Sequence, residues 1–290
     1  MAGESGGARL GVRKTYKLFI GGAFPRSESG RSYRVTAVGG ELLANAALAS
    51  RKDARDAVVA ARGALRGWSA ATAYNRGQVL YRVAELLEGR AAQFAAEVAA
   101  SEGVSAAAAR RSVAAATDRW VWYAGWSDKI GQVTGAANPV AGPYFNFSVP
   151  EPTGVVAVIA PSSSGLLGLV SVVAPVIVTG NTAVVVASEP RPLPAITLAE
   201  VLATSDLPPG VVNLLTGRTA ELAPVLASHM DVNAIDVSGV AADGRAGLQV
   251  LAAENVKRVF ASDDDWAAPP TPRRMLAFLE TKTVWHPIGI

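Results

Sequence analysis

The chain has 290 residues, of which 50% are hydrophobic and 18% charged, and its formal net charge is +3. This length and composition predict a large buried core and exclude disorder for most of the chain. No basic run and no interleaving of aromatic with basic residues stands out, so nucleic acid is not expected as a partner.

The chain contains no cysteine and only two histidines, which excludes disulfides and thiolate metal sites. We therefore predict no metal site. The first residues contain no apolar signal core, and the apolar run after Ser164 is too short to cross a bilayer. These features predict a cytoplasmic protein without a membrane contact.

The N-terminal third predicts an arm, a hairpin and three helices. Residues 1–15 are rich in glycine, lack periodicity and predict a mobile arm. Residues 16–24 predict a strand that enters a turn at Gly21 and Gly22, and residues 31–37 predict the strand that returns beside it. The spacing of apolar residues predicts helices over 50–64, 75–99 and 106–126.

Four aromatic residues gather near the end of the third predicted helix. Their helical spacing favours packing in a core or an interface over a ligand cage. These residues are Trp120, Trp122, Tyr123 and Trp126. Downstream, residues 141–149 alternate between apolar and polar side chains, which predicts a half-buried strand.

Residues 154–189 form the centre of the predicted fold. Residues 155–160 and 181–187 are β-branched runs that predict two buried strands, and the segment between them, 164–179, is apolar on almost every side. A strand, a buried helix and a second strand within about 30 residues are typical of a right-handed βαβ crossover in a parallel sheet.

The same alternation continues along the chain. Helices are predicted after Pro194 and over 221–226 and 244–253, and strands over 211–215, 232–237 and 256–260. The pattern predicts an α/β domain with a Rossmann-like parallel sheet and a ligand crevice at the carboxyl ends of its strands. Residues 263–271 then break the pattern, and residues 275–285 predict one long final strand.

Three segments carry a resemblance to a known family: EPTGVVAVIAP, APVIVTGNTAVVVASE and LPPGVVNLLTG. They resemble the cofactor-binding half of aldehyde dehydrogenases, and the similarity extends from about residue 18 to 260. The chain looks most like the non-catalytic second domain of the two-domain members. The resemblance implies a cofactor domain over 16–140 and 151–263, with oligomerisation strands over 141–150 and 273–290 in a small sheet.

The resemblance implies six vestigial cofactor-binding positions. Pro161 and Ser163 stand in the turn where the family has Pro-Trp-Asn, and the serine is too short to replace the amide that stabilises an oxyanion. Ser188 and Glu189 remain at the ribose position, where Val186 replaces the family's lysine. Gly239 and Gly244 keep the spacing of the pyrophosphate-binding turn.

Those positions also have plainer interpretations. Glycines at such a spacing are ordinary turn and cap residues, and Val240 replaces the family's serine between them. Ser262 stands where the family has its general-base glutamate. The three acids at 263–265 favour a solvated stretch over a base or a cation site.

The resemblance and these departures predict a catalytically inactive aldehyde dehydrogenase-like subunit. We expect it to assemble as a homodimer or with a catalytic aldehyde dehydrogenase and to need no cofactor. The alternative is an NAD(P)-binding oxidoreductase with residual activity that binds NAD weakly. Apolar side chains on the two oligomerisation segments are expected at the surface as anchors: Phe145, Phe147, Leu276, Phe278 and Trp285.

Overall fold

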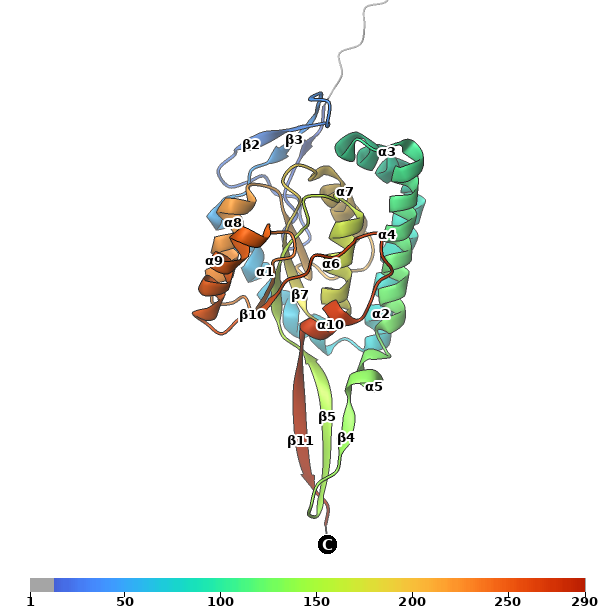
Figure 1. Ribbon diagram of the computed structural model, residues 1–290, viewed down its shortest axis with the longest axis vertical. Helices are drawn as coiled ribbons and strands as arrows, with labels where there is room; N and C mark the ends of the chain where they lie inside the picture. The colour runs from blue at the N-terminus through green and yellow to red at the C-terminus, as the bar shows by residue number, and fades with distance from the viewer. Residues whose placement is uncertain (1–12, 290) are drawn as a thin grey trace, which may run out of the picture.

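The structure of the protein, a computed structural model, describes residues 13–289 (Figure 1). A parallel sheet of five strands forms its centre, and helices cover both faces of the sheet. This confirms the predicted α/β fold. The strand order is β10 (Arg258–Phe260), β9 (Ala234–Asp236), β6 (Val155–Ile159), β7 (Thr182–Val186) and β8 (Val212–Leu215).

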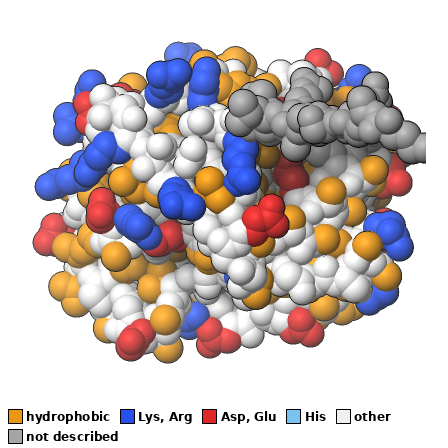
Figure 2. All heavy atoms as spheres, turned by 90° about the horizontal axis from the view of Figure 1, so that it is seen from above, with side chains coloured by type: hydrophobic (Ala, Val, Ile, Leu, Met, Phe, Trp, Pro, Cys, Tyr) orange, Lys and Arg blue, Asp and Glu red, His pale blue; other side chains and the backbone are white. Residues whose placement is uncertain are grey.

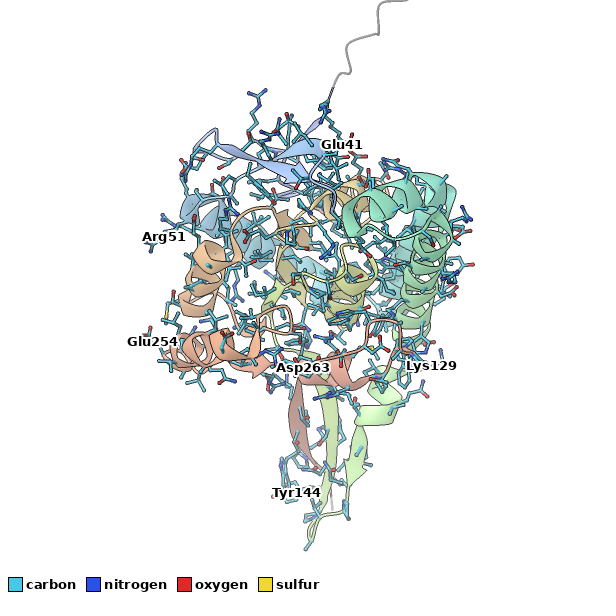
Figure 3. The ribbon with its side chains drawn as sticks, turned by 45° about the horizontal axis from the view of Figure 1, so that its top comes forward. Glu41, Arg51, Lys129, Tyr144, Glu254 and Asp263 are labelled. Atoms are coloured by element: carbon cyan, nitrogen blue, oxygen red, sulfur yellow. The ribbon has the colours of Figure 1, made fainter. Side chains whose placement is uncertain are left out.

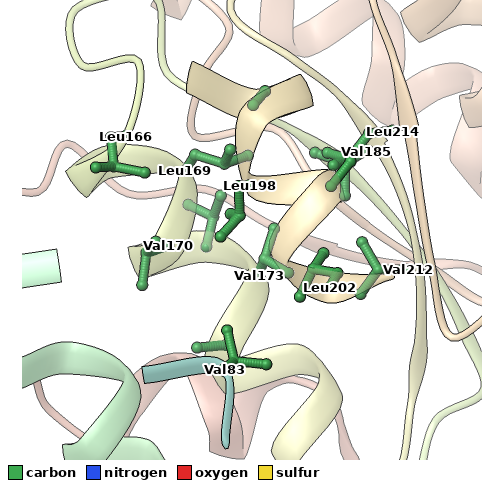
Figure 4. Close-up of a cluster of buried hydrophobic side chains, with 14 of the residues drawn as sticks. Val83, Leu166, Leu169, Val170, Val173, Val185, Leu198, Leu202, Val212 and Leu214 are labelled. Carbon is green, nitrogen blue, oxygen red and sulfur yellow. The ribbon is translucent and has the colours of Figure 1, made fainter. Parts of the chain in front are cut away.

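Alternate residues of the central strands face opposite layers of helices. Val155 and Ile159 pack in one buried cluster, whereas Val156 and Val158 pack in the other. Figure 4 shows part of the second cluster. The first cluster contains residues of α1 (Arg51–Ala70), α8 (Thr219–Ser228) and α9 (Ala242–Ala253). The second contains residues of α2 (Ala73–Gly89), α4 (Ala106–Trp126), α6 (Leu167–Val178) and α7 (Leu193–Leu202).

The apolar segment at the centre of the sequence forms α6, and every residue of this helix is buried. A helix without a polar face must be covered by protein on all sides, as the sequence predicts. The aromatic residues of α4 also pack as predicted, since Trp120 and Tyr123 are buried in the same cluster. Trp122 and Trp126 lie partly buried against it.

The predicted helix over 75–99 is wrong in one respect, because two helices occupy this region. α2 ends at Gly89 and is followed by its C-cap Arg90, whose backbone N–H donates to the carbonyl of Leu87 at 3.0 Å, and α3 (Ala91–Glu102) begins directly after Arg90. Leu87, Phe94 and Val98 are all buried in one cluster. The helical spacing of apolar residues therefore continues from α2 into α3. For this reason the sequence pattern does not reveal that the helix is broken.

The predicted N-terminal hairpin is also wrong. β2 (Ser32–Thr36) pairs with β3 (Leu42–Ala47), and β1 (Thr15–Tyr16) lies parallel to β3. The segment before β2 closes its own turn through Ile20 and Ala23, and Phe19 pairs instead with Leu214 of β8. Most of the predicted mobile arm lies outside the described residues, but Lys14 pairs with Glu200 and Thr15 is in β1, so residues 13–15 belong to the fold.

A small antiparallel sheet projects from the core at the end opposite β2 and β3 (Figure 1). Tyr144 lies near its tip (Figure 3). This projecting sheet consists of β4 (Ala136–Asn138), β5 (Tyr144–Pro152) and β11 (Leu279–Pro287), in the order β11-β5-β4, and the short helix α5 (Ile130–Thr134) leads into it. It confirms that residues 141–149 and the C-terminal strand pair with each other.

The C-terminal strand begins later than predicted. A short helix, α10 (Arg273–Ala277), precedes β11, and Phe278 lies fully buried in the core between them. Its ring centroid is 5.9 Å from that of Phe260. The expectation that Phe278 is a surface anchor is therefore wrong, because the turn after α10 directs this side chain inward.

Asn181 joins the projecting sheet to the core. Its side chain is fully buried, its Oδ1 accepts from the N–H of Gly154 at 2.7 Å, and its Nδ2 donates to the carbonyl of Phe278 at 2.8 Å. Gly154 adopts φ +133°, and a Cβ there would lie 2.2 Å from Oδ1 of Asn233. Two asparagines and one glycine thus fix the path from β5 into β6.

Asn181→Ala is expected to lower the free energy of unfolding by about 2–4 kcal/mol. The substitution leaves the buried N–H of Gly154 without a partner and removes the bond to the carbonyl of Phe278, directly before β11. Urea denaturation followed by circular dichroism measures the change. Asn75→Ala is the matched control because Asn75 is exposed on α2, and a loss as small as the control's would contradict the role of Asn181.

The surface carries charges of both signs. The face seen from above in Figure 2 has Lys and Arg side chains in its upper and left parts and at its right edge, and Asp and Glu side chains scattered across it and along its lower edge. Within residues 13–289, no helix combines the length and the apolar character that crossing a bilayer requires.

Candidate functional site

A cleft of about 1020 Å³ opens at the carboxyl ends of the parallel strands. β6 and β9 are neighbours there, and the chain proceeds outward from this pair in both directions, through β7 and β8 on one side and β10 on the other. Open α/β sheets bind ligands at such a reversal of strand order. The cleft is lined by residues of β2, by the loops after β6, β7 and β9, and by the first turns of α8 and α9.

A smaller cavity of about 360 Å³ adjoins the cleft. The two share Ser162 and residues 239–241, so they form one continuous depression. Ser262, Asp264 and Trp266 line the far side of the adjoining cavity. The depression thus extends from β2 to the segment that follows β10.

The structure brings five of the six predicted site residues to this depression. Glu189, Gly239 and Gly244 line the cleft. Pro161 and Ser163 line the adjoining cavity. Ser188 does not line either space, because its buried hydroxyl lies 3.4 Å from the carbonyl oxygen of Ser162 and accepts from the N–H of Arg191 at 3.3 Å.

Glu189 is engaged by protein groups on both carboxylate oxygens. Oε1 accepts from Arg218 at 2.6 Å, and Oε2 accepts from the N–H of Thr219 at 3.0 Å, which caps α8. The bond from Glu189 raises the pKa of Arg218, and burial together with the Glu189 charge raises the pKa of the neighbouring Tyr33. A ligand hydroxyl would therefore have to share a carboxylate that already fixes a helix terminus.

Gly239 makes a close approach that only glycine permits. A Cβ at this position would lie 2.3 Å from the carbonyl oxygen of Ala160 and 2.4 Å from that of Ile159. Its N–H donates to Ile159 at 3.1 Å and so is not available to an anion. Gly239 joins the ends of β6 and β9.

The first turn of α9, beside the cleft, offers backbone N–H groups, and its N-cap Ala241 supplies no side-chain cap. The turn also carries Asp243, whose negative charge opposes a bound anion. The N–H of Gly244 donates to the carbonyl of Ala241 at 3.0 Å. This helix start therefore combines backbone N–H groups with an opposing negative charge.

Three arginines that the sequence did not indicate as site residues also line the cleft: Arg34, Arg191 and Arg218. Arg191 donates through Nη1 to the carbonyl of Ser162, and its buried Nε has no partner among the described residues. Only the fold brings Arg34 and Arg218 into the same cleft as Glu189, and of the three arginines Arg218 pairs with its carboxylate. By contrast Val186, at the lysine position, is fully buried and adds no polar group.

Ser262, which the resemblance places at the position of the family's general base, lies in a polar cluster that borders the adjoining cavity. The Arg274 cluster consists of Arg274, Asp236, Asp264, Ser238 and Ser262. Arg274 donates to Ser262 at 2.8 Å, and Ser262 donates to Asp264 at 2.6 Å. Burial alone would raise the pKa of Asp264, but the bonds from Ser262 and Arg274 outweigh it and lower the pKa. Both carboxylates of this cluster, those of Asp236 and Asp264, are paired with Arg274.

The acids at 263–265 are all exposed, as predicted, and two of them are also ion-paired. Asp264 pairs with Arg274, and Asp263 pairs with Arg245 at 2.6 Å. The sequence conceals both pairs because their members are separated by 10 and 18 residues. Throughout residues 13–289, His, Asp and Glu side chains nowhere gather in threes as metal ligands.

Comparison with known proteins shows which proteins share this architecture. The Aldehyde dehydrogenase family profile matches residues 25–262. Cytosolic 10-formyltetrahydrofolate dehydrogenase of Mus musculus is 32% identical over 259 residues, which are 87% of this chain and 28% of that protein. "Aldehyde dehydrogenase, cytosolic 1" of Elephantulus edwardii is 32% identical over 84% of this chain and 49% of its own length.

Solved structures give the same result. The NAD+ complex of an aldehyde dehydrogenase from Bacillus cereus superposes with a TM-score of 0.79 at 28% identity, over 86% of this chain and 50% of that one. HpcC from Thermus thermophilus gives a TM-score of 0.81 at 30% identity, over 86% of this chain and 48% of that one. The chain thus spans half or less of the length of each of these relatives.

Proposed function

Because the chain belongs to the aldehyde dehydrogenase family, we propose that it is a member without aldehyde-oxidising activity that acts as an assembly subunit. It assembles as a homodimer or beside a catalytic aldehyde dehydrogenase, in the cytoplasm. Residues 16–140 and 151–263 supply the cofactor-domain fold, and residues 141–150 and 273–290 supply the assembly strands.

The composition of the site is the observation that carries the proposal. The 290 residues include no cysteine, and a serine in the Arg274 cluster stands at the general-base position. Covalent oxidation of an aldehyde through a thiohemiacetal needs a thiolate, an oxyanion donor and a base that act together. When residues that act as a unit are all replaced, little of the rate enhancement remains.

The cleft fits a nicotinamide cofactor only at its adenosine end. Ala223, Pro224 and Leu248 form an apolar wall, and Glu189 offers a carboxylate beside it. The phosphates of a dinucleotide would meet Asp243 and Val240 at the start of α9. We therefore propose no bound cofactor, with weak NAD binding as the alternative, and assign no step of chemistry to it.

NAD+ is expected to bind more weakly than low-micromolar affinity in calorimetry. The double change Val186→Lys and Val240→Ser restores two polar groups and should tighten binding roughly ten- to a hundredfold, the effect of one charged hydrogen bond. Val240→Ala is the control, since it shortens the side chain without adding a hydroxyl. Low-micromolar affinity of the unmodified chain would contradict the proposal.

The projecting sheet supports the assembly role. Phe145 and Trp285 are 50% and 59% exposed, and Leu276 is also exposed beside the sheet. Within the described part of the chain, β4 and β11 each pair on one side only, so both outer edges are open. Exposed edges with aromatic side chains are templates for pairing with another chain.

Sedimentation velocity tests the assembly role. The unmodified chain at micromolar concentration is expected to sediment as a dimer or a larger species, or to form a complex with a catalytic aldehyde dehydrogenase from the same cell. A stable interface of this kind buries at least about 1,000 Å². A monomer in both experiments would refute the assembly role while leaving the absence of oxidation untouched.

A further inference from the structure

The cleft at the carboxyl ends of the parallel strands borders an open strand edge. β2 is the outer strand of the small N-terminal sheet, whose order is β1-β3-β2, so among the described residues it pairs with β3 alone (Figure 1). Residues 33–38, four of them in β2, all line the cleft. Successive residues of a strand point to opposite faces, so a cleft lined by all of them runs along the free edge of that strand.

This outer edge of β2 offers backbone groups to a further strand. The N–H of Leu48 donates to the carbonyl of Arg31 at 3.0 Å, and alternate residues of an antiparallel ladder bond to the partner strand. Tyr33 therefore bonds to β3, whereas the N–H and C=O groups of Arg34 and Thr36 face outward. In the described part of the chain nothing pairs with these outward groups. Such an edge is a template for strand addition.

The cleft also carries a net positive charge. Three positive charges and one negative charge line it: Arg34, Arg191, Arg218 and Glu189. Both carboxylate oxygens of Glu189 are already bonded, to Arg218 at 2.6 Å and to the N–H of Thr219 at 3.0 Å. Among the described residues, no ion pair includes Arg34. The cleft therefore favours an acidic ligand.

We propose that the cleft binds an extended acidic segment of a partner protein, which adds as a strand to the outer edge of β2. Backbone bonds to Arg34 and Thr36 hold the segment, and its acidic side chains meet the arginines. Apolar side chains that alternate with the acidic ones pack on the wall that Ala223, Pro224 and Leu248 form. The proposal does not depend on the assembly role proposed above.

Fluorescence anisotropy of the full chain with a labelled, acetylated peptide of sequence DVDVDV tests the site. Saturable binding is expected, and the peptide KVKVKV, with the same label, should bind at least about tenfold more weakly because its charge is reversed. Two further copies are N-methylated on the aspartates or on the valines. One of them should also lose at least about tenfold in affinity, because only residues whose N–H groups face β2 are blocked.

Variants of β2 test the same contacts from the side of the protein. Arg34→Glu should weaken binding of DVDVDV at least about tenfold, whereas Arg31→Glu, at an exposed position outside the cleft, is the matched control and should change it less than about twofold. Thr36→Pro removes an outward N–H at an edge position where proline is tolerated, and it should weaken binding while Thr36→Ala does not.

The Tm of each variant shows whether it is folded, and the N-methylated peptides test the backbone bonds on the unmodified chain. Absence of saturable binding, equal binding of DVDVDV and KVKVKV, or full affinity for both N-methylated copies would overturn the proposal.

Discussion

Arg274→Met is expected to lower the free energy of unfolding by about 3–5 kcal/mol, because it leaves a buried carboxylate without its counter-ion. Asp236 is fully buried and Arg274 nearly so, and Arg274 also donates to Ser262 at 2.8 Å. The guanidinium lies over the ring of Phe260, 4.7 Å from its centroid, so the substitution also removes a cation–π contact. α10 and the segment before it would lose their main attachment to β9.

Urea denaturation measures this loss, and two further variants interpret it. Arg273→Met is the control, because Arg273 is the exposed neighbour in the same helix, and it should cost less than about 1 kcal/mol. Replacing both members of the pair, Arg274→Met with Asp236→Leu, should recover part of the loss, since no buried charge then remains unpaired. A loss for Arg274→Met no larger than the control's would show that the cluster does not stabilise the fold.

Phe145→Asp combined with Trp285→Asp is expected to weaken assembly at least about thirtyfold. The two side chains lie on neighbouring strands of the projecting sheet, where Phe145 pairs with His286 and Trp285 pairs with Asn146. Successive residues of a strand point to opposite faces, so the two variants together place a charge on both faces. Truncation of an aromatic anchor in an interface commonly costs about 2 kcal/mol or more, which is about thirtyfold in affinity.

Sedimentation velocity across a concentration series measures the effect on assembly. Tyr81→Asp is the matched control, because Tyr81 is an exposed aromatic residue on α2, away from the projecting sheet. Each single variant also reports which face of the sheet contacts the partner. Unchanged association of the double variant would exclude the projecting sheet as the interface.

The central sheet is predictable because its signals are local. β6 and β7 are short β-branched runs, and the apolar α6 between them requires cover on all sides. β3 is not predictable in this way because its sequence, LLANAA, has few residues that favour strands. The pairing of Phe19 with Leu214 leaves no local signal because it joins segments almost 200 residues apart along the chain.

The candidate site is predictable only where it follows family motifs. Glu189, Gly239 and Gly244 line the cleft as their motif positions imply. Asp236 and Arg274 are separated by 38 residues, and their pairing depends on where α10 folds back onto the sheet. No local spacing indicates such a pair. The same holds for the outer edge of β2, whose position along the cleft emerges only in the folded chain.

The most direct test of the central claim is steady-state NADH formation by the purified chain with NAD+ and a series of short aldehydes. Because the chain has no cysteine and a serine stands at the proposed general-base position, where it is hydrogen-bonded to Arg274 and Asp264, we expect no turnover above the uncatalysed rate. When the chain is mixed with a catalytic relative, the rate of NADH formation by the mixture should equal that of the relative alone. Steady NADH production by the chain alone, abolished by a substitution such as Gly239→Val in its cleft, would contradict the account.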